Sequence, residues 1–79
     1  VWLKNRKEDL TWKFAIQGKY GFFYADWLKT QKESILIDIG ANIGLYSLIA
    51  STNSNFKAIY SFEPHPETYQ FLVDNIHAN

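Results

Sequence analysis

The chain has 79 residues, and its 8 Lys and Arg balance its 8 Asp and Glu, so the formal net charge is zero. This balance argues against a nucleic-acid-binding arm or a polybasic membrane anchor, because both need an excess of positive charge. The absence of Cys excludes disulfide scaffolds, thiolate metal sites and Cys nucleophiles. An apolar content of 47% indicates a globular chain, yet no apolar run approaches the ~18 residues of a membrane span.

The residue pattern in the first third of the chain predicts one strand followed by one helix. The first ten residues are rich in charge. Over about residues 11–17, large apolar residues then alternate with polar or small ones, which is typical of a half-buried strand. Aromatic residues then recur at spacings of three and four and predict a helix over about residues 20–29. Residues 1–33 form an N-terminal extension in this interpretation, and we expect its aromatic helix to supply core or to cover a sheet edge.

Strands and helices alternate in the rest of the chain. Residues 34–39 are apolar on both faces apart from one acid, as a central strand of a parallel sheet requires. A glycine loop, a helix from 45 to about 51 and a second strand at 57–62 follow. A helix at 66–77 starts with proline, and its residues at helical spacing form one stripe, which consists of Thr68, Phe71, Leu72, Asn75 and Ile76. This order predicts an α/β fold with two parallel strands, a right-handed crossover, and helices on both faces of the sheet.

We expect the chain to be a piece of a longer protein. A chain of ~60 residues buries only about 60% of its unfolded surface, and two parallel strands leave edges that further strands would fill. Residues 34–79 would then be the first part of a larger domain that we do not expect to fold alone. Because charged residues follow the first three directly, no signal-peptide pattern is visible, and we expect a cytoplasmic location.

The loop after the first strand carries the chemistry. It reads Asp38-Ile39-Gly40-Ala41-Asn42-Ile43-Gly44 and lies at the carboxyl end of the strand, where ligands bind in open α/β sheets. The two glycines let the backbone turn tightly and approach a ligand, and the next helix begins with free amide donors. Glu63 ends the second strand about 20 residues later, where a carboxylate can accept hydrogen bonds from a ribose diol. The pattern predicts a nucleoside cofactor.

The spacing within this loop bears on which cofactor binds. A dinucleotide site needs glycines at relative positions 1, 3 and 6, whereas this chain offers Gly40, Asn42 and Leu45. The acid Asp38, two residues before the first glycine, disfavours a diphosphate and suits a cationic ligand. S-adenosylmethionine, with its ammonium and sulfonium groups, is therefore favoured over NAD.

The chain contains two sequence motifs, DIGANIG and FEPHPETY. Together with the separation between them, these motifs resemble the FkbM family of S-adenosylmethionine-dependent methyltransferases, and the resemblance covers roughly residues 34–79. The resemblance implies the first βαβα portion of a Rossmann-like class I methyltransferase fold and methyl transfer to a hydroxyl of a sugar, glycan or secondary metabolite. It implies that the loop holds the methionine part, that Gly44 lets the helix start close to the sheet, that Glu63 binds the ribose, and that Pro64 and His65 border the adenine. The implied cofactor-binding residues are Asp38, Gly40, Ala41, Asn42, Gly44, Glu63, Pro64 and His65.

Simpler interpretations stay open beside this one. Asp38 could cap a turn or the following helix, the glycines could serve packing alone, and Glu63 could be a solvated loop acid. His65 and His77 have no partners at metal-ligand spacing, so no metal is expected. Alternatives to the methyltransferase are an NAD(P)- or other nucleotide-binding module and a non-catalytic fragment. The expected partner is a small-molecule or glycan acceptor, and we expect neither a nucleic-acid partner nor a membrane span. Catalytic residues are expected beyond Asn79, and the oligomeric state is open.

Overall fold

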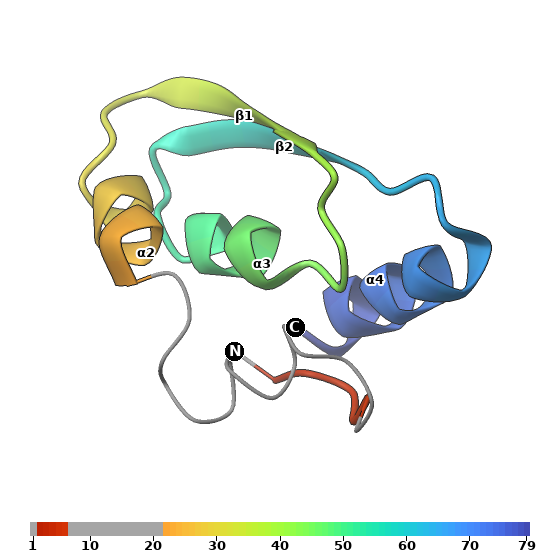
Figure 1. Cartoon of the computed structure of the whole chain (residues 1–79). Helices are drawn as coiled ribbons and strands as arrows, with labels where there is room; N and C mark the ends of the chain where they lie inside the picture. Colours follow the sequence, from red (N-terminus) through yellow and green to blue (C-terminus); the bar gives the residue numbers. More distant parts are fainter. Residues whose placement is uncertain (1, 7–21) are drawn as a thin grey trace.

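The computed structural model describes residues 2–6 and 22–79, and the strand predicted over about 11–17 lies outside these residues. The described part has a βαβα order with two parallel strands, preceded by a helix (Figure 1). It is a small α/β arrangement consistent with a Rossmann-like fragment, as the sequence predicted. The elements are α2 (Phe22–Lys29), β1 (Ser34–Ile39), α3 (Leu45–Ser51), β2 (Phe56–Phe62) and α4 (Pro66–Ala78).

The two strands run parallel and end at the same edge of the sheet. Their register places Asp38 opposite Ser61 and Ile39 opposite Phe62, after an irregularity near Ser34. Because side chains alternate along a strand, Asp38 and Ser61 share one face, and Ile39 and Phe62 share the other. The residue that follows β2 is Glu63, so both acids singled out in the sequence lie at the carboxyl edge of the sheet.

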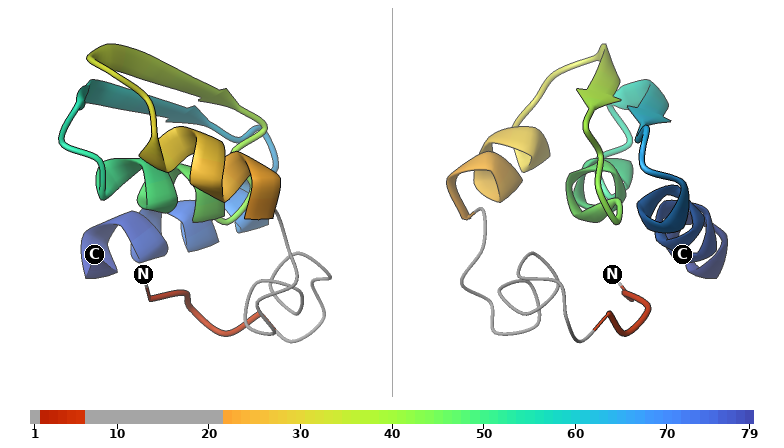
Figure 2. Two further views of the ribbon diagram at one scale, coloured as in Figure 1. Left: turned by 90° about the vertical axis from the view of Figure 1, so that its left-hand side faces the viewer. Right: turned by 45° about the vertical axis from the view of Figure 1, so that its right-hand side comes forward.

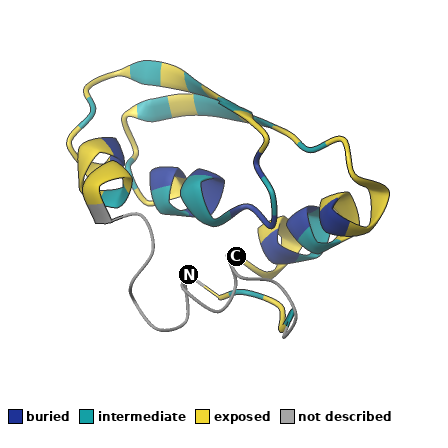
Figure 3. Cartoon of the chain, in the orientation of Figure 1, coloured by how far each residue is buried: buried dark blue, intermediate teal, exposed yellow. Residues whose placement is uncertain are grey.

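All the described helices lie on one face of this sheet (Figures 1 and 2). The buried residues belong to the helices and to the loop that joins β1 to α3, whereas the strands are intermediate or exposed (Figure 3). In α4 the predicted apolar stripe is confirmed at Leu72, which is 1% exposed, while Ile76 is 43% exposed. The core consists of Leu28, Ala41, Ile43, Leu48, Ala50 and Leu72.

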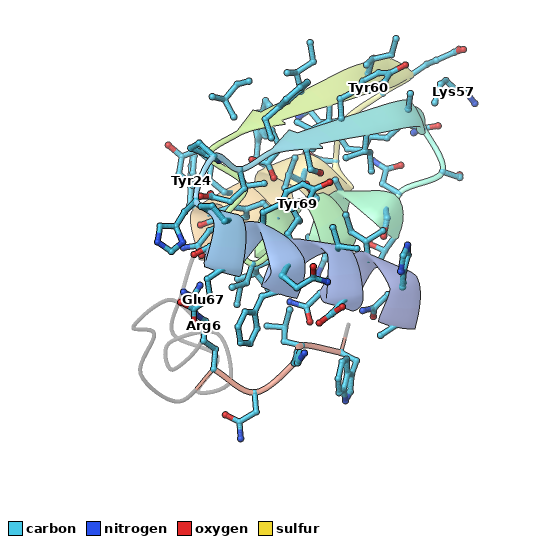
Figure 4. The ribbon with its side chains drawn as sticks, turned by 90° about the vertical axis from the view of Figure 1, so that its right-hand side faces the viewer. Arg6, Tyr24, Lys57, Tyr60, Glu67 and Tyr69 are labelled. Carbon is cyan, nitrogen blue, oxygen red and sulfur yellow. The ribbon has the colours of Figure 1, made fainter. Side chains whose placement is uncertain are left out.

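The prediction of helices on both faces is wrong for the described residues. The opposite face, here called the outer face, carries five large apolar side chains that are 53–75% exposed. Figure 4 shows one of them, Tyr60, on the side of the sheet away from the helices. The reason is that each described connection returns beneath the same face, so no described element reaches the other one. The outer face consists of Ile35, Ile37, Ile39, Tyr60 and Phe62.

Helix α2 packs against α3, and Leu28 is its most buried described side chain. Leu28 is 4% exposed, whereas Phe23, Tyr24 and Trp27 are 49–77% exposed, so the expectation that these aromatic residues form core is wrong. The amide Nδ2 of Asn53, in the loop before β2, donates to the Leu28 carbonyl over 3.0 Å. Since the last carbonyls of a helix lack partners within the helix, this amide closes the end of α2.

None of the helices within residues 2–6 and 22–79 combines the length and the apolar character that a bilayer-crossing segment requires.

Candidate cofactor site

The loop between β1 and α3 has a left-handed backbone at three positions. The φ angles are +73° at Gly40, +55° at Asn42 and +95° at Gly44. Glycine adopts such angles without steric cost, and asparagine is among the few other residues that tolerate them. This explains locally why the sequence has an asparagine between the two glycines.

Hydrogen bonds tie the loop to the end of β2. The backbone N–H groups of Gly40 and Ala41 both donate to the Phe62 carbonyl over 2.9 Å. The N–H of Asn42 donates to Oε1 of Glu63 over 2.8 Å, so a side chain at the end of one strand fixes the loop after the other. The loop conformation is therefore set by β2 as well as by its own residues.

The two glycines differ in what surrounds them. A Cβ atom at Gly44 would lie 2.7 Å from Cδ1 of Leu72, whereas one at Gly40 would meet nothing within 4 Å. The close neighbour of Gly44 is thus Leu72 of α4, and the implied role of Gly44, to let α3 start close to the sheet, stays a prediction. Gly44 is required both by its backbone angle and by the packing of Leu72, and Gly40 by its backbone angle.

Glu63 uses both of its carboxylate oxygens within the chain. Oε1 accepts from Asn42, and Oε2 accepts from the backbone N–H of His65 over 3.2 Å. The residue is half-buried. A carboxylate offers about four lone-pair sites, so each oxygen retains capacity for one further donor. Glu63 therefore combines support of the loop with an acceptor at the strand edge.

Asp38 lies on the covered face beside two serine hydroxyls. Ser47 donates from Oγ to Oδ2 of Asp38 over 2.6 Å, and its Oγ lies 2.6 Å from Oγ of Ser61. Ser47 is 4% exposed and comes from α3, so the cluster joins that helix to both strands. The helix itself has no side-chain cap, since its N-cap is Gly44, and the interpretation of Asp38 as the cap of this helix is wrong.

A cavity of about 350 Å³ opens beside Asp38, between α2 and β1. Its size is at the lower end of small-molecule sites. The rings of Tyr24 and Tyr46, which also line the cavity, meet edge to face at 5.8 Å between centroids. Asp38 is therefore not sealed in the core. The lining residues are Tyr24, Trp27, Leu28, Leu36, Ile37, Asp38, Ile39 and Tyr46.

Pro64 and His65 connect the strand edge to α4. His65 is the N-cap of this helix, and its Nδ1 accepts from the N–H of Thr68 over 3.3 Å, just ahead of Pro66 in the first turn. Both Pro64 and His65 are exposed. This capping role of His65 was not predicted, although a proline at the first position of a helix indicates that the preceding residue is the N-cap.

Three further residues near the loop were missed as site residues. Ser61 could have been found from the strand register, because it pairs with Asp38, but Ser47 has no local signal and is placed only by the packing of α3. Asn75 was predicted only as part of the stripe of α4, yet its Nδ2 donates to the Ile43 carbonyl of the loop over 2.7 Å.

The described site is suited to holding a ligand at the sheet edge. Two carboxylates flank a tightly turned loop, a pattern that favours a ligand with positive charge and hydroxyl groups. No group of three or more His, Cys, Asp or Glu within the described ranges is placed to hold a metal ion.

Comparison with known proteins gives one informative similarity. No family model matches the chain, and no solved structure matches it. Over 47 residues the chain is 36% identical to the hexuronic acid methyltransferase AglP of Haloferax volcanii, a match that covers 60% of this chain and 18% of that protein. The chain thus spans a small part of its relative's length. The chain therefore has a distant and partial similarity to a methyltransferase.

Proposed function

We propose that this chain forms the first part of the S-adenosylmethionine site of an FkbM-type methyltransferase. The observation that carries the proposal is the placement of Asp38 and Glu63 at one edge of the sheet, on either side of the glycine loop, with Glu63 bound to the N–H of Asn42. The similarity to a methyltransferase that acts on a hexuronic acid supports the reaction class. We infer a hydroxyl of a sugar, glycan or secondary metabolite as the methyl acceptor.

Each end of the site suits a different part of this cofactor. The carboxylate of Asp38, beside the cavity, would face the positively charged amino-acid end, and the remaining acceptor sites of Glu63 would take the ribose hydroxyls. Pro64 and His65 would border the adenine. The bound cofactor supplies an electrophilic methyl group, and the residues described here bind and orient it. We assign the proton acceptor to none of them.

The competing ligand is a dinucleotide. A diphosphate would lie near the carboxylates of Asp38 and Glu63, and like charges at short distance are unfavourable. Calorimetric titration of the full-length protein with S-adenosylhomocysteine and with NAD separates the two. We expect binding of S-adenosylhomocysteine alone, and binding of NAD alone would refute the proposal.

The first variant to test is Glu63→Ala. Loss of a hydrogen bond to a charged group costs about 1.5–3 kcal/mol, so the affinity for S-adenosylhomocysteine should fall about tenfold or more. Glu33→Ala is the matched control, because Glu33 is exposed and precedes β1, at the other end of the sheet. Equal affinities of the two variants would remove Glu63 from the site.

A second measurement separates ribose binding from loop support, since Glu63 also holds Asn42. The 2′-deoxy analogue of S-adenosylhomocysteine lacks one of the hydroxyls that Glu63 is proposed to bind. It should bind about tenfold more weakly than S-adenosylhomocysteine in the unmodified protein and nearly as well as it in Glu63→Ala. An equal ratio in both proteins would mean that Glu63 acts on the loop alone.

A further inference from the structure

The side chain of Asn75 bridges two segments that are far apart in the sequence. Its Nδ2 donates to the Ile43 carbonyl over 2.7 Å, and its Oδ1 accepts from the backbone N–H of Lys4 over 2.6 Å. The residue is 0% exposed. A buried amide needs partners at both ends, and here each partner is a backbone group from outside α4.

Residues 2–6, here called the strap, run along α4 (Figure 4). At one end the backbone N–H of Trp2 donates to Oδ1 of Asn79, and Nδ2 of Asn79 donates to the Trp2 carbonyl, both over 2.8 Å. At the other end the guanidinium of Arg6 donates to Oγ1 of Thr68 over 2.8 Å. The strap is therefore attached near both ends of the helix, with the Asn75 contact between them.

Charged groups add to the attachment of the strap. Nζ of Lys4 lies 2.6 Å from Oδ2 of Asp74, and the cationic groups of Lys4 and Arg6 lie 5.2 and 4.9 Å from the centroid of the Phe71 ring. Hydrogen bonds from Lys4 and Gln70 lower the pKa of Asp74 below its ordinary value. The ion pair is partly exposed, with 47% and 33% of the two side chains accessible, so it contributes less than the shielded contact to Asn75.

At its other end, Asn75 reaches the most constrained part of the loop. The Ile43 carbonyl follows the left-handed Asn42 and precedes the left-handed Gly44, and Ile43 is 0% exposed. The other hydrogen bonds of the loop described above run to Phe62 of β2 and to Glu63, whereas Asn75 holds this carbonyl from the side of α4. A buried carbonyl without a donor is costly, so this hydrogen bond helps to select the observed loop conformation.

We propose that the strap positions the cofactor loop through Asn75, an inference that rests on the proposed function. The Lys4 N–H can pair only with the oxygen end of the Asn75 amide. When the strap is in place, the nitrogen end is therefore turned to the Ile43 carbonyl. When the strap is released, the amide loses the donor that fixes its orientation, and the binding conformation of the loop is populated less. The apparent affinity for the cofactor falls in proportion to the population of this binding conformation.

The test uses two substitutions at one position in the full-length protein. Lys4→Pro removes the N–H that Asn75 requires, whereas Lys4→Ala keeps it and removes only the ion pair and the contact with Phe71. We expect the affinity for S-adenosylhomocysteine to fall about tenfold in Lys4→Pro and about twofold in Lys4→Ala. Circular dichroism verifies that each variant is folded before titration.

A coupling measurement separates positioning from a general loss of stability. In an Asn75→Leu background, which keeps the branched shape of the side chain but removes both hydrogen bonds, Lys4→Pro should cause no further loss of affinity. A purely structural strap would instead give losses that add, and this outcome would overturn the proposal.

Hydrogen exchange provides a readout that needs no ligand. The N–H of Gly44 donates to the Ala41 carbonyl over 2.9 Å, and its exchange should be about tenfold faster in Lys4→Pro than in Lys4→Ala. Equal exchange rates together with equal affinities in the two variants would overturn the role of the strap. Faster exchange in Lys4→Pro, in a protein that binds no S-adenosylhomocysteine, would support that role and refute the proposed function instead.

Discussion

The cofactor loop and the outer face of the sheet differ in how fully the described residues complete them. In the loop, β2, Glu63 and Asn75 each supply hydrogen-bond partners, and Leu72 packs against Gly44. On the outer face, side chains such as Ile37 and Ile39 are 61% and 75% exposed. The conformation of the loop is thus fixed by contacts within the described residues, whereas the outer face has the apolar composition of a core and no described element packs on it.

This difference indicates at which positions a substitution should lower the free energy of unfolding. A group with several close neighbours cannot be altered without a cost in stability, while an exposed side chain makes few contacts that can be lost. Three substitutions, taken from the largest expected effect to the smallest, test whether the loop and the outer face differ in this way.

The largest effect is expected for Gly44→Ala. The new Cβ would lie 2.7 Å from Leu72 Cδ1, at a backbone angle that costs an L-residue about 1–2 kcal/mol, and overpacking adds about 1–3 kcal/mol. We expect a loss of about 2–5 kcal/mol in the free energy of unfolding, measured by chemical denaturation. Gly40→Ala is the matched control and should lose about 1–2 kcal/mol, because it meets only the backbone cost. Equal losses would show that Leu72 does not constrain the loop.

An intermediate effect is expected for Ser47→Ala. This change removes the hydroxyl that donates to Asp38 and leaves a half-buried carboxylate without that donor, at a cost of about 1–3 kcal/mol. The control is Ser51→Ala, one turn further along α3, where an exposed serine bonds only to the Leu48 carbonyl. Thermal unfolding of both variants provides the measurement. A larger loss in Ser51→Ala would contradict the importance of the serine cluster.

The smallest effect is expected for Ile37→Thr, on the outer face. Surface substitutions usually change the free energy of unfolding by less than about 0.5 kcal/mol, and Ile37 is 61% exposed. The buried comparison is Leu48→Ala, which should lose about 2–5 kcal/mol, because Leu48 is 4% exposed. If Ile37→Thr lost more than about 1 kcal/mol, the outer face would be covered in solution, and the contrast with the loop would fail.

The sequence predicted the elements of the βαβα unit closely. The helix after the loop starts at Leu45 and ends at Ser51 as predicted, and β2 begins one residue earlier than expected, at Phe56. These elements follow from hydrophobic periodicity and from the glycines and proline between them, which are local signals. The placement of Asp38 and Glu63 at one edge also followed, because parallel strands present their carboxyl ends together.

Other features depended on contacts that no local pattern encodes. The aromatic residues of α2 show helical spacing, yet among the described side chains of this helix Leu28 alone is buried, because the helix packs against α3 and a cavity lies between it and β1. The hydroxyl of Ser47 reaches Asp38 only because α3 packs across both strands. Asn75 is a polar residue within an apolar stripe, and its partners at Lys4 and Ile43 are 71 and 32 positions away.

The sequence by itself determined the order of strands and helices, the left-handed loop and the two acids at the strand ends. These properties depend on backbone preferences and on the alternation of side chains, which act over a few residues. Only the tertiary structure decided which face of the sheet is covered, what Asp38 and Glu63 bind within the chain, and that the strap reaches the loop through Asn75. Those contacts join residues that are distant in sequence, and they exist only once the helices have packed against the sheet.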